Sequence, residues 1–234
     1  MDKLWIMEGI KLMGEFFSEV MDYMPLLMEG TKMTIVVFCF TLLFSLPLGL
    51  PIALGEECKF KPLAWLCKAY VWVFRGTPLM LQLCFFYFAL PMYTPIKLDV
   101  IQTGVVTFIL NYAAYFAEIY RGGMKSIDKG QYEASFALGL SKKQTLFDIV
   151  LPQTMKAILP PVINEAITLI KDTALIMTIG GAELMKNAYA VVSRTSQVSS
   201  LIVAGIIYLI LTLLLTLVAS RLEKHFARYD QKGE

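Results

Sequence analysis

The sequence predicts an all-α integral membrane protein with five transmembrane helices, an amphipathic N-terminal helix on the outer side, and a cytoplasmic two-helix loop between the third and fourth spans. Apolar residues make up 57% of the 234 residues and charged residues only 17%, whereas soluble domains are closer to about half apolar and a quarter charged. The mean hydropathy is +0.62. The apolar residues gather in runs of roughly 20, the helix length that crosses a hydrocarbon core.

The N-terminal segment, residues 1–30, carries apolar side chains at helical spacing, among them Met13, Phe17 and Val20. This periodicity predicts an amphipathic helix that lies on the membrane surface, and a flexible leader is the alternative. The segment lacks the basic start, the compact apolar run and the small-residue cleavage site of a signal peptide. We therefore expect no cleavable signal peptide here.

The transmembrane domain is predicted over residues 31–222, followed by a cytoplasmic tail over residues 223–234. Pro47 and Pro51 fall in the later half of the first span, and the pair Pro160–Pro161 lies where the fourth span begins. Prolines disturb the hydrogen bonding of a helix, so the fourth span is expected to be broken near its start. The five spans are expected at residues 33–54, 77–93, 100–119, 157–182 and 201–219.

Lysine and arginine residues are distributed unevenly between the connections. Most of the 21 fall after the first span, after the third span and in the C-terminal tail. In a five-span protein these three segments lie on the same side of the membrane. Because cytoplasmic segments are enriched in basic residues, the distribution predicts an N-terminus outside the cell and a C-terminus in the cytoplasm.

The connection over residues 120–155 is the longest polar segment, and its pattern predicts two short helices. The first is expected over residues 131–140 and ends at Gly139, a residue suited to a left-handed cap. Ser141 and Gln144 have the spacing of a capping box, which predicts the start of the second helix. Pro152 is expected to stop that helix.

The first of these short helices offers a narrow face of small residues, Ala134, Ser135 and Ala137, which could enter the groove of another protein, and Glu133 adds one charge for a specific pair. The segment Glu133–Ser135 and Gly139 carry a resemblance. Together with Ile149 and Leu151–Pro152 they have the spacing of the EAA loop of ABC importer permeases. Serine replaces the usual alanine at the third position and keeps the residue small. A helical hairpin without a partner is the alternative interpretation.

The resemblance extends over residues 26–222 and is strongest to the polar amino-acid subfamily, notably the glutamine, cystine and basic amino-acid permeases. It implies a subunit of the bacterial inner membrane that forms a dimer with a second copy or a homologous permease. It also implies two ATP-binding cassette ATPase subunits, which bind ATP and Mg²⁺, and an external solute-binding protein. The other matching segments are Arg75–Pro78 with Gln82, Asn111–Glu118 with Arg121–Gly122, Lys129–Gln131, Ile170–Leu175 and Glu183–Leu184.

The fourth span contains a polar stripe that predicts the path of the solute. Ionisable groups inside a span cost about 2.5–3.5 kcal/mol each by insertion scales, so they face a partner or a water-filled path. Residues seven apart lie nearly on one helical face, which places Glu165 and Asp172 together. The stripe consists of Asn164, Glu165, Thr168, Lys171 and Asp172.

An amino acid needs an acceptor for its ammonium group and a donor for its carboxylate. Glu165 suits the ammonium group. Lys171, or the backbone N–H groups of broken helices near Pro78 and the proline pair of the fourth span, would suit the carboxylate. Structural ion pairing of Lys171 and Asp172 with other helices is the alternative. The resemblance further implies that Gln82, Asn111 and Glu165 line the solute pocket.

The sequence contains no G-x-x-x-x-G-K-[ST] phosphate-binding loop, so we expect a transport subunit without its own ATPase motif and with no cofactor of its own. Four scattered cysteines and one histidine provide no catalytic set and no metal site. The net charge of +2 gives no indication of a nucleic-acid partner. The alternative function is a secondary transporter or channel that moves a small polar solute without an ATPase.

Overall fold

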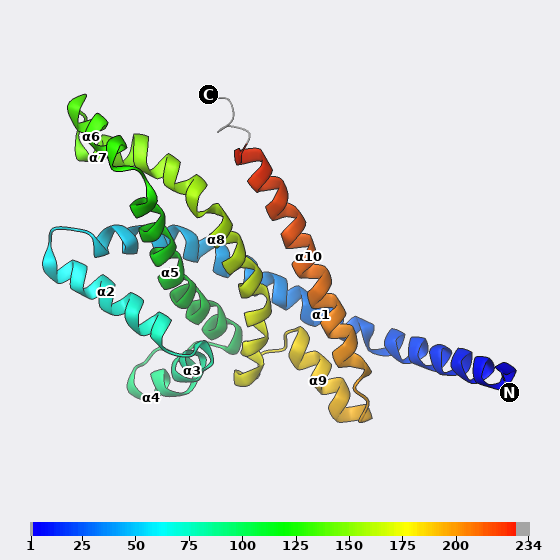
Figure 1. The fold of residues 1–234 in the computed structure, drawn as a ribbon. Helices are drawn as coiled ribbons and strands as arrows, with labels where there is room; N and C mark the ends of the chain where they lie inside the picture. Colours follow the sequence, from blue (N-terminus) through cyan, green and yellow to red (C-terminus); the bar gives the residue numbers. More distant parts are fainter. Residues whose placement is uncertain (1, 228–234) are drawn as a thin grey trace.

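A computed structural model describes the backbone of residues 2–227 and the side chains of residue 8 and residues 13–224. Most of this part of the chain is helical (Figure 1). The elements are α1 (Asp2–Glu56), α2 (Lys61–Gly76), α3 (Leu79–Cys84), the π-helical turn η1 (Phe85–Ala89), α4 (Leu90–Tyr93), α5 (Val100–Ser126), α6 (Lys129–Ala137), α7 (Lys142–Gln144), the π-helical turn η2 (Thr145–Val150), α8 (Leu151–Asp172), the 3-10 helix η3 (Thr173–Ile179), α9 (Leu184–Thr195) and α10 (Ser199–Ala227).

The described helices include four that are long and apolar enough to cross a membrane. They lie at Met13–Glu56, Val100–Ser126, Lys142–Ile179 and Ser199–Lys224, and a bent pair, Lys61–Gly76 with Leu79–Tyr93, makes a fifth when it is counted as one span. The predicted class, an all-helical membrane protein, is confirmed. The side chains of residues 1–7 and 9–12 of the predicted amphipathic segment, and those of residues 225–234 of the predicted tail, lie outside the described part of the chain.

Helix α1 differs from the separate surface helix that we expected over residues 1–30. It runs without a break for 55 residues, about 80 Å at 1.5 Å per residue, and its N-terminal part extends beyond the other helices (Figure 1). Val20, Tyr23 and Leu27 pack against α9 and α10. Farther along, Gly49 passes so close to α5 that an added Cβ would lie 2.8 Å from Phe116. These tertiary contacts hold both halves of one helix, which local periodicity cannot reveal.

The second span is built differently from the single helix predicted at residues 77–93. Helix α2 precedes it, and the axes of α2 and of the Leu79–Tyr93 helix differ by 105°. Lys61, Lys68 and Arg75 interrupt the apolar run of α2, which is why the sequence suggested a basic connection. Arg75 thus belongs to the last turn of a helix and not to a loop.

Helix α5 occupies the centre of the bundle, in contact with α1, α2 and α8 (Figure 1). It starts at Val100 as predicted, after a capping box formed by Asp99 and Gln102. Its large side chains Phe108, Tyr112 and Phe116 are fully or almost fully buried. This central position allows α5 to contribute side chains to a site on either of its flanks.

The helix after Gly139 continues much farther than we predicted. Gly139 has φ of +74° and Ser141 forms the capping box with Gln144, so both local predictions are confirmed. Pro152 does not stop the helix. The π-helical turn η2 precedes it, and the Leu151 N–H bonds to the carbonyl of Leu146, five residues back. A widened turn of this kind makes room for a proline that a regular helix would reject.

The pair Pro160–Pro161 also lies inside the continuous helix α8, so the predicted break at the start of the fourth span is wrong. Prolines are tolerated in membrane helices when neighbouring groups satisfy the freed backbone. Helix α9 was not predicted at all, because its short run is half polar. Glu183 caps it by accepting hydrogen bonds from the backbone N–H groups of Met185 and Lys186 at 2.8 and 2.7 Å.

Candidate functional site

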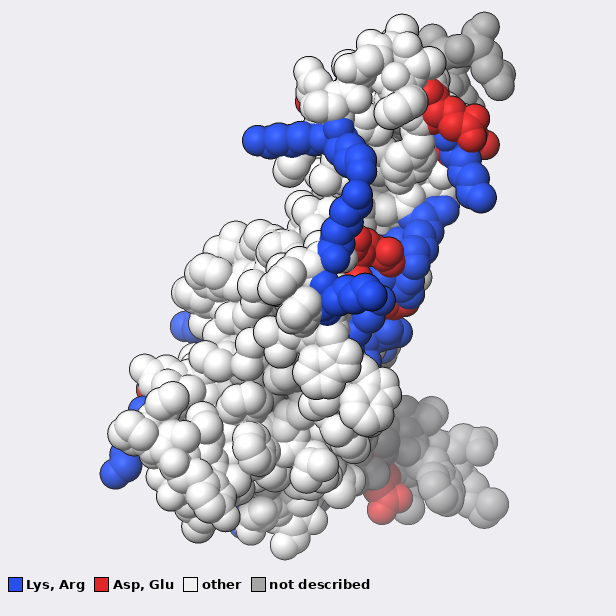
Figure 2. Space-filling view, turned by 90° about the vertical axis from the view of Figure 1, so that its left-hand side faces the viewer, with Lys and Arg blue, Asp and Glu red and all other residues white. Residues whose placement is uncertain are grey.

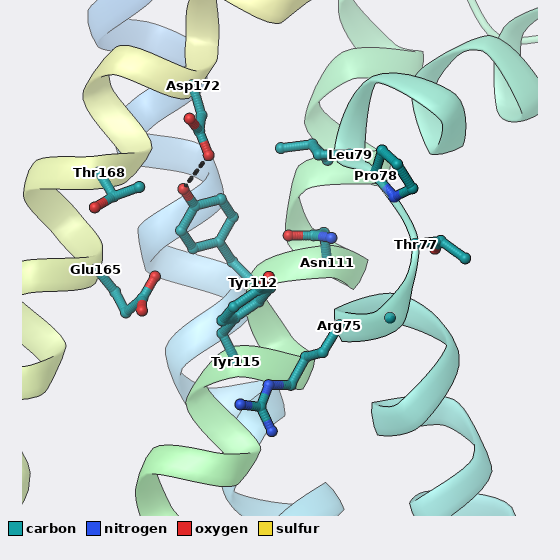
Figure 3. Close-up of a pocket in the computed structure, with 11 residues that line it drawn as sticks. Arg75, Thr77, Pro78, Leu79, Asn111, Tyr112, Tyr115, Glu165, Thr168 and Asp172 are labelled. Carbon is teal, nitrogen blue, oxygen red and sulfur yellow. Dashed lines mark hydrogen bonds between the residues drawn. The ribbon is translucent and has the colours of Figure 1, made fainter.

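A polar cavity of about 440 Å³ lies between α5, α8 and the bend that follows α2 (Figure 3). Three chain segments distant in sequence meet here. The lining residues are Arg75, Gly76, Thr77, Pro78, Leu79, Asn111, Tyr112, Tyr115, Glu165, Thr168 and Asp172. Of the predicted pathway residues, the structure therefore brings together Asn111, Glu165, Thr168 and Asp172.

One wall of the cavity is acidic and comes from α8. Glu165, Thr168 and Asp172 project from one face of this helix, as their spacing predicts, toward α5 (Figure 3). Asp172 accepts a hydrogen bond from the Tyr112 hydroxyl at 2.8 Å. Among the described residues, no hydrogen bond or ion pair reaches the Glu165 carboxylate. The wall therefore offers one carboxylate held by the protein and one open to a ligand.

The opposite wall carries a positive charge from Arg75. The guanidinium carbon lies 5.4 Å from the centre of the Tyr115 ring, a cation–π distance, and Nη1 lies 3.6 Å from a carboxylate oxygen of Glu118. That separation exceeds a hydrogen bond, so the planar donors of Arg75 retain capacity for a further acceptor. Carboxylates are the acceptors that match this planar fork best.

The bend after α2 is held by Gln82, which does not line the cavity. Its Nε2 donates to the carbonyl oxygens of Phe74 and Thr77 at 2.9 and 3.1 Å, and its Oε1 accepts from Asn111 Nδ2 at 3.0 Å. Gln82 thus lies behind the wall that it was expected to form. The Asn111 side-chain nitrogen donates to Gln82, which lies outside the cavity lining, so the Asn111 side-chain oxygen points toward the α8 side of the cavity (Figure 3).

Lys171 is the other predicted pathway residue that the cavity does not include. Its side chain is exposed, and it is absent from the lining. Sequence reasoning instead missed Arg75, Tyr112 and Tyr115. The available signal was the segment Arg75–Pro78, in which a basic residue directly precedes a helix break.

The two-helix loop lies at one end of the molecule, away from the cavity (Figure 1). Glu133 and Ala134 are exposed on α6, whereas Ser135 is 3% exposed and donates to the Gln131 carbonyl oxygen at 2.7 Å. Two large apolar side chains close to them in the sequence are also exposed, Phe136 at 83% and Leu138 at 79%. This end of the molecule therefore exposes apolar area next to Glu133 and Ala134.

A bundle of membrane-crossing helices with a cavity of mixed charge between three of its segments and an ordered, exposed loop at one end is typical of a membrane transport subunit. Comparison with known proteins narrows this class. Residues 45–228 match the family model for the binding-protein-dependent transport system inner membrane component. The chain belongs to this family.

Individual relatives agree over nearly the whole chain. The chain is 38% identical to the arginine transport system permease protein ArtQ of Bacillus subtilis, covering 92% of this chain and 98% of the relative. It is 37% identical to the glutamine transport system permease protein GlnP of Escherichia coli, covering 89% and 96%. A crystal structure of an amino acid ABC transporter with histidines matches with a TM-score of 0.84 at 33% identity, covering 90% of this chain and 98% of the other.

Proposed function

We propose that this chain translocates a polar amino acid by alternating access, as the permease subunit of an importer that a separate ATPase drives. One observation carries the proposal: the cavity has Arg75 on one wall and Glu165 with Asp172 on the other. An α-amino acid carries one carboxylate and one ammonium group. Walls of opposite charge therefore match the two ends of such a zwitterion and fix its orientation.

Each cavity residue then has a definite task. Arg75 binds the solute carboxylate through its planar fork, with Tyr115 supporting the guanidinium from one side. Glu165 and the Asn111 oxygen accept from the ammonium group. Asp172 is held by Tyr112 and contributes negative charge, and Thr168 adds a hydroxyl. The relatives named for arginine and glutamine transport support an amino-acid solute.

The loop containing Glu133, Ala134, Ser135 and Gly139 is the proposed docking surface for the ATPase subunit, which would hold ATP and Mg²⁺. Exposed Phe136 and Leu138 supply apolar area for that contact. An external solute-binding protein would deliver the solute, and a second permease copy or a homologous permease would complete the dimer. When ATP closes the ATPase pair, the two loops move with it and the spans open outward.

The distribution of charge supports the proposed orientation, with the loop and C-terminus in the cytoplasm and the N-terminus outside. Lys and Arg side chains gather toward the loop end of the molecule, while the lower part of the same face is largely uncharged (Figure 2). Basic residues concentrate on the cytoplasmic side of membrane proteins. Reporter fusions to the two termini would test this orientation.

Co-purification tests the proposal as a whole. The tagged chain is isolated from its native membrane in a mild detergent, and the proteins that accompany it are identified. We expect an ATP-binding cassette ATPase that is lost with Glu133→Arg and retained with Ser135→Ala, which restores the usual motif. Recovery of the chain alone, with solute uptake driven by an ion gradient, would instead establish a self-sufficient carrier.

A further inference from the structure

A series of alternating charges starts at the cavity wall. Arg75 Nη1 lies 3.6 Å from Glu118 Oε2. The same carboxylate accepts two hydrogen bonds from Arg121, one from Nε at 3.0 Å and one from Nη2. Arg75 lines the cavity, whereas Arg121 does not. Glu118 therefore connects a residue that can meet the solute with one that cannot.

The series continues to the end of α1. Arg121 Nε lies 3.7 Å from Glu56 and Nη1 lies 3.9 Å from Glu57. Glu56 is only 5% exposed, and one of its oxygens has no hydrogen-bond partner among the described residues, so the nearby Arg121 is its main compensating charge. Lys125 Nζ closes the series 2.9 Å from Glu57, and this hydrogen bond lowers the pKa of the Glu57 carboxyl.

The far end of the series reaches the exposed loop. Arg121 and Lys125 line a hollow of about 390 Å³ together with Tyr132 of α6. The Tyr132 hydroxyl donates to the Met124 carbonyl oxygen at 3.1 Å, which ties α6 to the end of α5. Figure 2 views this side and shows acidic side chains set among Lys and Arg side chains near the loop end. Tyr132 directly precedes the docking residue Glu133.

We propose that Glu118 is a positioning residue that couples the occupancy of the cavity to the loop, an inference that rests on the proposed function. Arg75 faces Glu118 at a separation longer than a hydrogen bond. A solute carboxylate has the same charge as Glu118 and competes with it for the guanidinium. When Arg75 turns to the solute, Arg121 must redistribute its bonds among three carboxylates.

This redistribution has a mechanical consequence because the three carboxylates lie on different elements. Glu118 belongs to α5, Glu56 ends α1, and Glu57 follows it. A shift of Arg121 between them changes how the ends of α1 and α5 are held together, and Tyr132 rests on that junction. The competing explanation is local: Glu118 and Arg121 are three residues apart and could stabilise only the helix that carries them.

The test uses the complete transporter in vesicles: this chain, its ATPase and its binding protein. ATP hydrolysis is measured with and without solute-loaded binding protein. Glu118→Gln should lower the ratio of stimulated to basal hydrolysis by about fivefold or more, while basal hydrolysis and assembly stay unchanged. The control Arg194→Gln, which removes an exposed arginine from α9, should retain the ratio. A retained ratio in Glu118→Gln overturns the proposal.

A charge reversal distinguishes coupling through the whole series of charges from local stabilisation of α5 by the pair of Glu118 and Arg121. The double variant Glu118→Arg with Arg121→Glu restores the pair within α5 but places an arginine beside Arg75 and a glutamate beside Glu56. We expect the coupling ratio to remain low, and its full recovery would refute the series.

Should Glu118→Gln reduce assembly, Glu57→Gln at the exposed end of the series must lower the ratio of stimulated to basal hydrolysis, and an unchanged ratio overturns the proposal. Normal uptake and ATPase binding in Glu133→Arg would instead refute the proposed function.

Discussion

The Tyr112 hydroxyl donates a hydrogen bond to Asp172 at 2.8 Å, and this contact separates the roles of the two acidic residues in the cavity. Asp172 is anchored to α5, the central helix. Glu165 has no hydrogen bond or ion pair within the described part of the chain and points into the same space (Figure 3). The predictions that follow depend on this difference.

Glu165→Gln should raise the KM for solute uptake by about tenfold or more, because hydrogen bonds to charged groups contribute about 1.5–3 kcal/mol. Glu165→Ala should act in the same direction. Both variants should still co-purify with the ATPase. Uptake by reconstituted vesicles over a range of solute concentrations measures the effect, and an unchanged KM would remove Glu165 from the site.

Tyr112→Phe should destabilise the protein by about 1 kcal/mol, since it deprives the half-buried Asp172 of its donor. Tyr115→Phe is the matched control: it lies on the same helix and keeps the aromatic ring beneath Arg75. Thermal unfolding of the purified protein compares the two. Equal losses of stability would mean that the bond to Asp172 contributes nothing measurable.

Arg75→Gln should weaken the uptake of an amino acid far more than that of the corresponding amine without a carboxylate. Among the described residues, Arg75 is the cation that lines the cavity. The amine has no carboxylate for Arg75 to bind, so replacing Arg75 removes no such contact from the amine. Competition between the two compounds in vesicles gives the ratio of affinities. If the variant weakens the uptake of both compounds equally, Arg75 shapes the cavity but does not bind the carboxylate.

Gly139→Ala should reduce coupling between the ATPase and transport. Gly139 has φ of +74°, and an added Cβ meets no atom within 4 Å, so the cost arises from backbone strain of roughly 1–2 kcal/mol. Gly139→Asn should be milder, because asparagine tolerates left-handed geometry. Transport per ATP hydrolysed is the measurement, and a more severe loss in the asparagine variant would contradict the strain argument.

Gly30→Ala should destabilise the contact between α1 and α9 by about 1–3 kcal/mol. A Cβ at Gly30 would lie 2.8 Å from the backbone of Leu184, which cannot move as a side chain can. Gly14→Ala in the same helix is the control, because nothing lies within 4 Å there, and it should be neutral or slightly stabilising. Thermal unfolding of the two variants would contradict this packing if their midpoints shifted equally.

Several features were predictable because they depend on short stretches of chain. The start of α5 at Val100, the left-handed Gly139 and the capping box of Ser141 with Gln144 all follow from local chemistry, and all are confirmed. The polar stripe of α8 was found in the same way, since residues seven apart share a helical face.

The failures have a common physical origin. Pro152 does not end its helix because a π-helical turn absorbs it, and α1 does not end near residue 30 because α9 and α10 pack on it. In both cases, neighbouring structure compensates for a local preference. Lys171 was one of two donors considered for the solute carboxylate, the other being backbone N–H groups, and its side chain lies on an exposed face of α8.

The sequence by itself determined that this chain is a helical membrane protein with an ordered two-helix loop, because apolar run length, periodicity and capping are local properties. It also determined the acidic wall, which one helix carries alone. Only the tertiary structure decided that Arg75 faces Glu165 across a cavity and that Arg75 lies beside Glu118. Those relationships join helices that are distant in the sequence, and the packing around α5 sets their distances.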